Sequence, residues 1–117
     1  MRENHRNSIL VLRKAQEEDR YTKLIVQLLK DFRLANISVD LTILITPEDL
    51  KRAVHEKIYY LLMEKGNDYL NFMYVVDIPE KDSRKSRDID VVDLAEKVTF
   101  LVLRRELQKV RLKEELD

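Results

Sequence analysis

Residues 46–66 read TPEDLKRAVHEKIYYLLMEKG, and this stretch carries signals for both ends of a helix. Thr46 is suited to cap the first turn with its hydroxyl, and Pro47 fits the first helical position, where no backbone N–H is needed. The two acidic residues that follow place negative charge at the positive end of the helix dipole. Gly66, the only glycine in the chain, is of the type that ends helices in a left-handed conformation. We therefore predict a helix over about 47–65.

One face of this predicted helix is apolar. Its hydrophobic residues recur three and four positions apart, which is the spacing of an amphipathic helix that buries one side. They are Leu50, Val54, Ile58, Leu61 and Leu62.

The composition favours one helical domain. The chain has 117 residues, of which 44% are hydrophobic and 38% charged, with only one glycine and two prolines. An all-β fold would need more turn residues. Twenty-two basic residues balance twenty-two acidic ones, so no overall field steers the chain onto nucleic acid. The lack of cysteine excludes disulfides, thiol catalysis and cysteine zinc sites.

Three further helices are predicted. Apolar residues at steps of three and four favour a helix over about 18–35, and Asn36 is a reasonable stop. A short helix is predicted after the helix over 47–65, and it ends at about residue 76. Asp90 is suited to cap a long helix that runs to about residue 112.

The other segments lack helical periodicity. Residues 37–45 alternate apolar and polar side chains, which is typical of an extended segment lying across the helices or of a strand. With strands at 9–12, 37–45 and 70–78, the chain would be an α/β protein instead. We expect residues 1–17 to be weakly ordered and residues 80–90 to form a solvated connection.

The long C-terminal helix has a second apolar stripe, roughly 120° from its first. A helix apolar on two sides packs against two neighbours, and the second neighbour is either the helix predicted at about 18–35 or another subunit. The candidate interface on this stripe is formed by Leu103, Leu107 and Val110. An exposed strand edge at 37–45 is a second candidate for self-association.

Aromatic residues are concentrated between positions 59 and 74. They suit a corner of the core. Tyr59 and Tyr60 are also candidates for exposed anchors of a protein interface, because tyrosine rings are rigid and amphipathic.

The motifs of common enzymes are absent or incomplete. Residues 55–59 read HEKIY, which lacks the second histidine of the zinc-protease helix motif. No glycine-rich loop is present to hold phosphate. We therefore expect no catalytic residue, no cofactor, no metal site and no membrane-spanning segment.

Basic residues occur in two clusters, at 81–87 and 104–113. Together they would form a phosphate-binding patch, which is the basis of an alternative function as a nucleic-acid-binding adaptor. Acidic residues are interleaved with both clusters and would cancel much of the local potential. A solvated face is the simpler interpretation.

Two short segments resemble a family of small uncharacterised bacterial proteins. Residues 74–80 read YVVDIPE and residues 105–109 read RELQK, and the family has Tyr-x-x-Asp-(Ile/Val)-(Ser/Pro)-Glu and Arg-x-Leu-Gln-Lys at corresponding places. The resemblance implies a helical fold and a bacterial cytoplasm, and it brings no known activity. It also suggests that Asp77 and Arg105 belong to one structural unit. Arg105 falls on the first apolar stripe of the long C-terminal helix, so we expect its stem to lie against the core and its guanidinium to form a buried ion pair with a carboxylate such as Asp77 or Glu56.

Together these features predict a mainly α single domain over residues 18–117, with three longer helices, one short helix and the extended segment 37–45. We expect a non-catalytic protein-interaction or assembly module that binds a protein partner or itself, as a homodimer.

Overall fold

The computed structural model describes residues 2–116, which form six helices and no strand. The fold is therefore a mainly α helical bundle, as predicted, and the α/β alternative is wrong: residues 9–12 lie within a helix, and so do residues 70–76. The helices are α1 (Arg2–Glu17), α2 (Tyr21–Leu34), α3 (Pro47–Glu64), α4 (Gly66–Val76), α5 (Glu80–Ser83) and α6 (Val91–Leu116).

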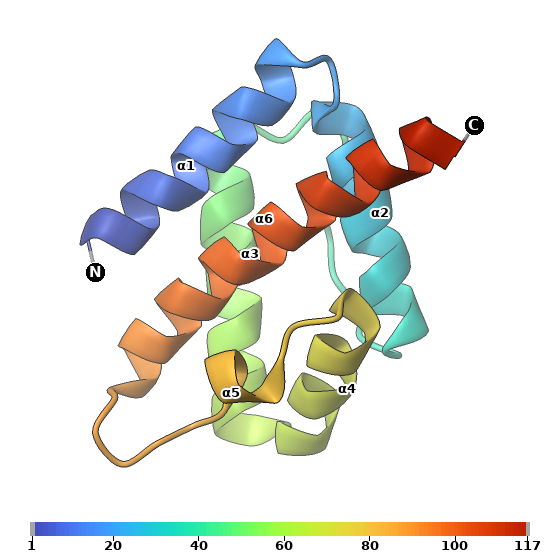
Figure 1. Ribbon diagram of the computed structural model, residues 1–117. Helices are drawn as coiled ribbons and strands as arrows, with labels where there is room; N and C mark the ends of the chain where they lie inside the picture. Colours follow the sequence, from blue (N-terminus) through green and yellow to red (C-terminus); the bar gives the residue numbers. More distant parts are fainter. Residues whose placement is uncertain (1, 117) are drawn as a thin grey trace.

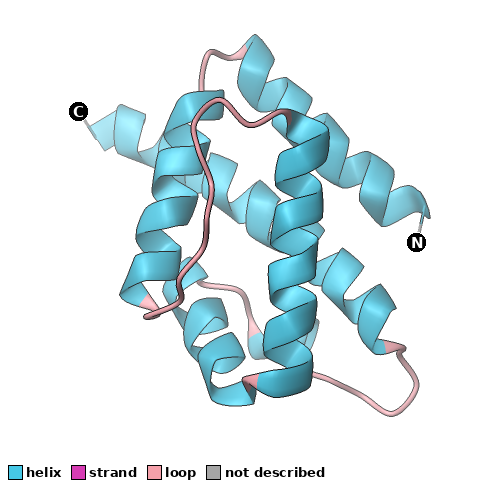
Figure 2. Ribbon diagram, turned by 180° about the vertical axis from the view of Figure 1, so that it is seen from behind, coloured by secondary structure: helices cyan, strands magenta, loops and turns pink. Residues whose placement is uncertain are grey.

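The bundle is organised around α6. Figure 1 shows α6 crossing diagonally in front of α2 and α3, with α1 beside it and the short α5 near its first half. From behind, α2 and α3 run lengthwise, and the loop that connects them passes between them (Figure 2). The C-terminal helix thus packs against helices on several sides, which explains why it is apolar on more than one face.

The N-terminal segment is part of the core. We expected residues 1–17 to be weakly ordered, but Arg2–Glu17 forms α1, and Leu12 and Ala15 are fully buried in the same hydrophobic core as the other helices. Residue 1 lies outside the described residues. The short apolar run in this segment gives only a weak signal of a buried helix in the sequence, because its burial depends on the surface that α6 provides.

Helix α3 begins as the sequence predicted. The Thr46 hydroxyl accepts a hydrogen bond from the Asp49 amide at 3.3 Å, and Pro47 occupies the first turn. The predicted role of Gly66 is wrong: Lys65 ends α3 with a φ of −139°, and Gly66 opens α4. Since the next helix begins at once, no left-handed residue is needed at this corner.

The loop between α2 and α3 is extended and forms no strand. Ile37 and Leu41 are buried and their polar neighbours are exposed, as the alternating pattern predicted. The Tyr21 hydroxyl donates to the Ile45 carbonyl oxygen at 2.7 Å and so ties the end of the loop to the start of α2. The strand edge expected at 37–45 as a site of self-association is therefore not formed.

The connection before α6 is more ordered than expected. Residues 80–83 form α5, and the Tyr69 hydroxyl donates to the carbonyl oxygen of the buried Ser83. Asp90 caps α6 as predicted, because its carboxylate accepts a hydrogen bond from the Val92 amide at 2.7 Å. Within residues 2–116, no helix has both the length and the apolar character needed to cross a bilayer.

Candidate functional site

The second apolar stripe of α6 is not an exposed interface. Leu103, Leu107 and Val110 are buried in this chain, because α1 and α2 pack on either side of α6. The prediction that these residues bind another subunit is therefore wrong. The alternative, that the helix predicted at about 18–35 packs against this stripe, is correct for α2, and α1 covers it as well.

Tyr59 and Tyr60 lie on α3 with exposed fractions of 36% and 46%. The ammonium of Lys57 lies 5.7 Å from the centre of the Tyr60 ring, within the range of a cation–π contact. The two tyrosines are thus available at the surface, and their use in an interface stays a prediction.

Asp77 and Arg105 form the predicted ion pair, but the pair is not buried. An Arg105 Nη2 to Asp77 Oδ2 distance of 3.0 Å joins α6 to the end of α4, and the Asp77 side chain is 76% exposed. Asp77 also ends α4 in the left-handed conformation, with a φ of 76°. Because this left-handed turn at the end of α4 lies at the surface, the Asp77 carboxylate stays exposed.

A surface groove with a volume of about 610 Å³ lies between α1 and α6. It is lined on the α1 side by Leu10, Val11, Arg13, Lys14 and Glu17, and on the α6 side by Arg104, Leu107 and Arg111. We call it the α1–α6 groove. Leu10 is 53% exposed on its wall, whereas Leu107 lies buried at its base.

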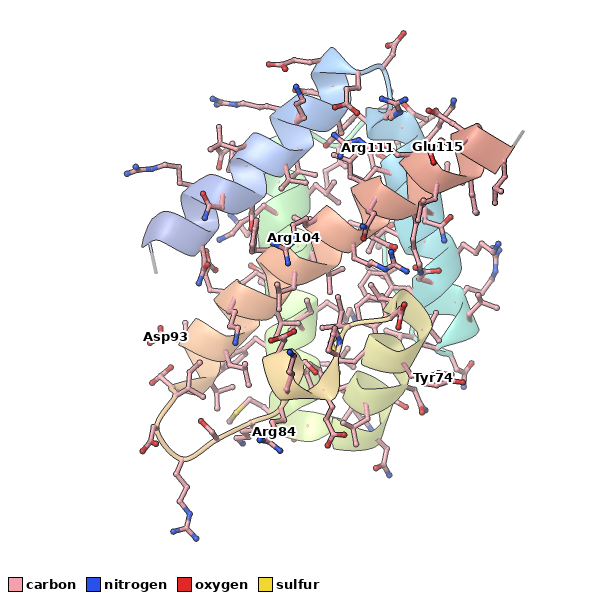
Figure 3. The ribbon with its side chains drawn as sticks, viewed as in Figure 1. Tyr74, Arg84, Asp93, Arg104, Arg111 and Glu115 are labelled. Atoms are coloured by element: carbon pink, nitrogen blue, oxygen red, sulfur yellow. The ribbon has the colours of Figure 1, made fainter. Side chains whose placement is uncertain are left out.

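The α1–α6 groove is basic. Four cations line it against one carboxylate, Glu17, whose oxygen lies 4.0 Å from Lys14. Arg111 binds Glu18 outside the groove, so counting both glutamates against the four cations leaves a net charge of +2. Arg104 packs over the Phe100 ring at 4.9 Å and forms no ion pair with any described residue. Figure 3 shows Arg104 and Arg111 along α6 beside α1, with Arg84 well away from them.

The cations of the two basic clusters predicted from the sequence differ in the contacts that they make. On α6, three cations already bind acceptors on other helices: Arg105 binds Asp77, Lys109 binds Asp31, and Lys113 binds Gln27. The cations at 81–87 are exposed on and after α5. Much of the positive charge of α6 thus serves to hold the bundle together.

A buried polar cluster, which the sequence analysis missed, lies where α6 meets α2. Glu106 is fully buried and Asp31 is 2% exposed. Lys109 Nζ lies 2.6 Å from Asp31 Oδ2 and 3.7 Å from Glu106 Oε1. Burial, reinforced by the neighbouring Asp31 carboxylate, raises the pKa of Glu106 to about 9, so this group is neutral at pH 7.

A second cluster joins α3 to α6. Lys51 Nζ lies 2.6 Å from Glu96 Oε1, and His55 Nε2 lies 3.2 Å from Glu96 Oε2. His55 is thus part of an interhelical contact rather than an ordinary surface histidine. Among the described residues, no group of three or more histidine and carboxylate side chains is arranged to hold a metal ion.

A third cluster fastens the C-terminal end of α6 to the turn between α1 and α2. Arg111 forms two hydrogen bonds with the Glu18 carboxylate, at 2.9 and 2.5 Å. Arg20 contacts both Glu18 and Glu114 at 2.6 Å. These arginines hold the pKa of Glu18 at about 2, well below its usual value.

Comparison with protein-family models, with curated proteins and with solved structures finds no match to this chain. The resemblance noted for residues 74–80 and 105–109 stays a prediction. The candidate site therefore depends on the chemistry of the α1–α6 groove alone.

Proposed function

We propose that this protein is a non-catalytic protein-interaction module, and that its α1–α6 groove binds an acidic amphipathic helix of a partner protein. The observation that carries the proposal is the combination, in one groove, of an exposed leucine with a surplus of arginine and lysine. Arginine and apolar side chains together are typical of surfaces that bind proteins.

The dimensions of the groove suit a helix. Its lining residues span positions 10–17 on α1 and 104–111 on α6, and the first and last of eight helical residues lie about 10 Å apart along the axis, or two turns. A partner helix with one apolar side chain per turn would place these against Leu10 and the buried Leu107. Its acidic residues would then lie near Arg13 and Arg104, in the arrangement by which grooves bind amphipathic helices.

The distribution of charge supports a protein partner over a nucleic acid. A nucleic-acid surface needs many free cations along the phosphate backbone. Here Arg105, Lys109 and Lys113 bind other residues of the chain, and the groove retains a local surplus of two charges beside apolar side chains. Binding to nucleic acid through 81–87 and 104–113 is the less supported alternative.

The test is fluorescence anisotropy with a labelled acidic amphipathic peptide of about 14 residues, long enough for four turns. We expect saturable binding that weakens about tenfold in Arg104→Glu and in Arg13→Glu, because each introduces a repulsive charge. Arg84→Glu is the matched control, since it makes the same change away from the groove and should bind normally. A peptide of the same composition in scrambled order should bind more weakly.

Three results would overturn the proposal: no saturable binding, equal binding by Arg104→Glu and the unaltered chain, or tighter binding of a DNA or RNA oligonucleotide than of the peptide. Light scattering over a concentration series tests the expected homodimer separately. A dimer that Arg104→Glu dissociates would assign the groove to a second copy of this chain, against the proposal of a different partner.

A further inference from the structure

A second groove lies between α2 and α6, and it differs in character from the first. Its volume is about 310 Å³, close to the lower end of the range of small-ligand sites. The lining residues are Thr22, Lys23, Val26, Gln27, Lys30, Val110, Lys113 and Glu114. We call it the α2–α6 groove.

The base of the α2–α6 groove combines an apolar side chain, Val110, with a polar one, Gln27, whose orientation is fixed by hydrogen bonds. Val110 and Gln27 are buried, whereas Val26 on the wall is exposed. The Gln27 amide donates to Asp31 Oδ1 at 3.0 Å, and its oxygen accepts from Lys113 Nζ. The amide therefore cannot turn without breaking a contact, and a ligand meets a preorganised surface.

The rim supplies positive charge that this chain does not neutralise. Glu114, the one carboxylate of the lining, binds Arg20 and Lys23. Lys30 forms no ion pair with residues 2–116, and an ammonium such as that of Lys113 has three N–H donors, of which Gln27 takes one. Two lysines thus have free donors beside an apolar base.

We infer that the α2–α6 groove binds a small organic acid, with its carboxylate between Lys30 and Lys113 and its short aliphatic chain against Val26 and Val110. Charge complementarity selects an anion, and the valines select a molecule with an apolar part. The site is on the other side of α6 from the α1–α6 groove and does not depend on the function proposed for it.

Hexanoate is the probe, followed by ¹⁵N–¹H NMR of the full chain, with hexylammonium as a control that carries the opposite charge on a similar aliphatic chain. We expect saturable shifts of the amides of Val26, Gln27, Val110 and Lys113, with a Kd of about 1 mM, as for a ligand of this size. Hexylammonium should give no saturable shift there.

Two variants test the assigned contacts. Lys30→Met keeps the stem and removes the charge, so we expect hexanoate to bind about fivefold more weakly. Val26→Ser removes the apolar contact at an exposed position and should weaken binding while the spectrum stays that of a folded protein. Lys85→Met, with the same loss of charge in the loop before α6, should bind hexanoate normally.

The inference is overturned if hexanoate gives no saturable shift at these amides, if hexylammonium binds equally well, or if Lys30→Met and Lys85→Met bind hexanoate with the same affinity. Each of these readouts is independent of the peptide-binding experiment on the α1–α6 groove.

Discussion

The ammonium of Lys109 on α6 lies 2.6 Å from the carboxylate of Asp31 on α2, and Asp31 is almost completely buried. The same ammonium donates to the carbonyl oxygen of Val75 near the end of α4, at 3.1 Å. One side chain therefore joins three helices at a place where an unpaired charge would be costly.

We expect Lys109→Met to lower the free energy of unfolding by about 3 kcal/mol, because it leaves a buried carboxylate without its cation. Urea unfolding followed by circular dichroism measures the change. Lys85→Met is the control, since this lysine is exposed in a loop and its loss should change stability by less than about 0.5 kcal/mol. Equal stability of the two variants would contradict the importance of the buried pair.

Glu106 makes the stability of the fold depend on pH between about 4.5 and 9. Its pKa is about 9 in the folded chain against an ordinary value of 4.5, so between these values the folded chain keeps a proton that the unfolded chain has released. The free energy of unfolding therefore falls as pH rises through this range and levels off above about pH 9. The contribution that is lost is fully present below pH 4.5.

We accordingly expect Glu106→Gln, which has nearly the same shape and no proton to lose, to be more stable than the unaltered chain at pH 7, by up to about 3 kcal/mol. The advantage should grow from pH 5 to pH 8. Thermal unfolding across this series measures it, with the exposed Glu115→Gln as control. A difference that stays constant with pH would show that Glu106 ionises normally in the folded protein.

Much of the framework could be predicted from the sequence, because local signals determine it. Thr46, Pro47 and Asp90 act within one turn of their own helix, and the apolar face of α3 follows from its spacing. The buried role of Glu106 could not be predicted in this way. It stands in a charged stretch with the composition of a solvated face, and only the packing of α2 against α6 buries it.

The same limit explains why the candidate site was misplaced. The sequence shows that α6 is apolar on two sides, but it does not show which element covers the second side. Since α1 was expected to be weakly ordered, only the helix at about 18–35 or another subunit could be considered as the neighbour of Leu103, Leu107 and Val110. The groove of Arg13 and Arg104 exists only because α1 packs beside α6.

Glu18 stabilises the fold on the acidic side of the pH range. Its pKa is lowered to about 2 by its contacts with Arg111 and Arg20, so the unfolded chain takes up a proton first as the pH falls from about 4.5. The stabilisation is present above pH 4.5 and is lost as the pH falls through 2. We expect the melting temperatures of the unaltered chain and of Glu18→Gln to converge between pH 5 and pH 2. Glu17→Gln, at the adjacent exposed position, should leave the acid profile unchanged, and so should Glu18→Gln if the arginine contacts do not form in solution.

The pair of Arg105 and Asp77 should contribute little to stability. Because Asp77 is largely exposed, solvent screens the charges, and exposed pairs of this kind contribute less than about 1 kcal/mol. Arg105→Met, which retains the apolar stem, is expected to reduce the free energy of unfolding by less than that amount. A loss as large as that of Lys109→Met, measured by the same urea unfolding, would mean that the pair is buried after all.

The corner between α3 and α4 can be tested through Gly66. If Gly66 ended α3 in a left-handed conformation, alanine there would be strained and destabilising by about 1 kcal/mol. In the structure its φ is not positive, it begins α4, and a Cβ at this position would meet no atom within 4 Å. We therefore expect Gly66→Ala to raise the free energy of unfolding by about 0.5 kcal/mol, since alanine favours the helix and restricts the unfolded chain. Asn36→Ala provides the contrast, because Asn36 has a φ of 62° and alanine should lower stability there. Urea unfolding of both variants should show changes of opposite sign, and a loss of stability in Gly66→Ala would restore the left-handed assignment.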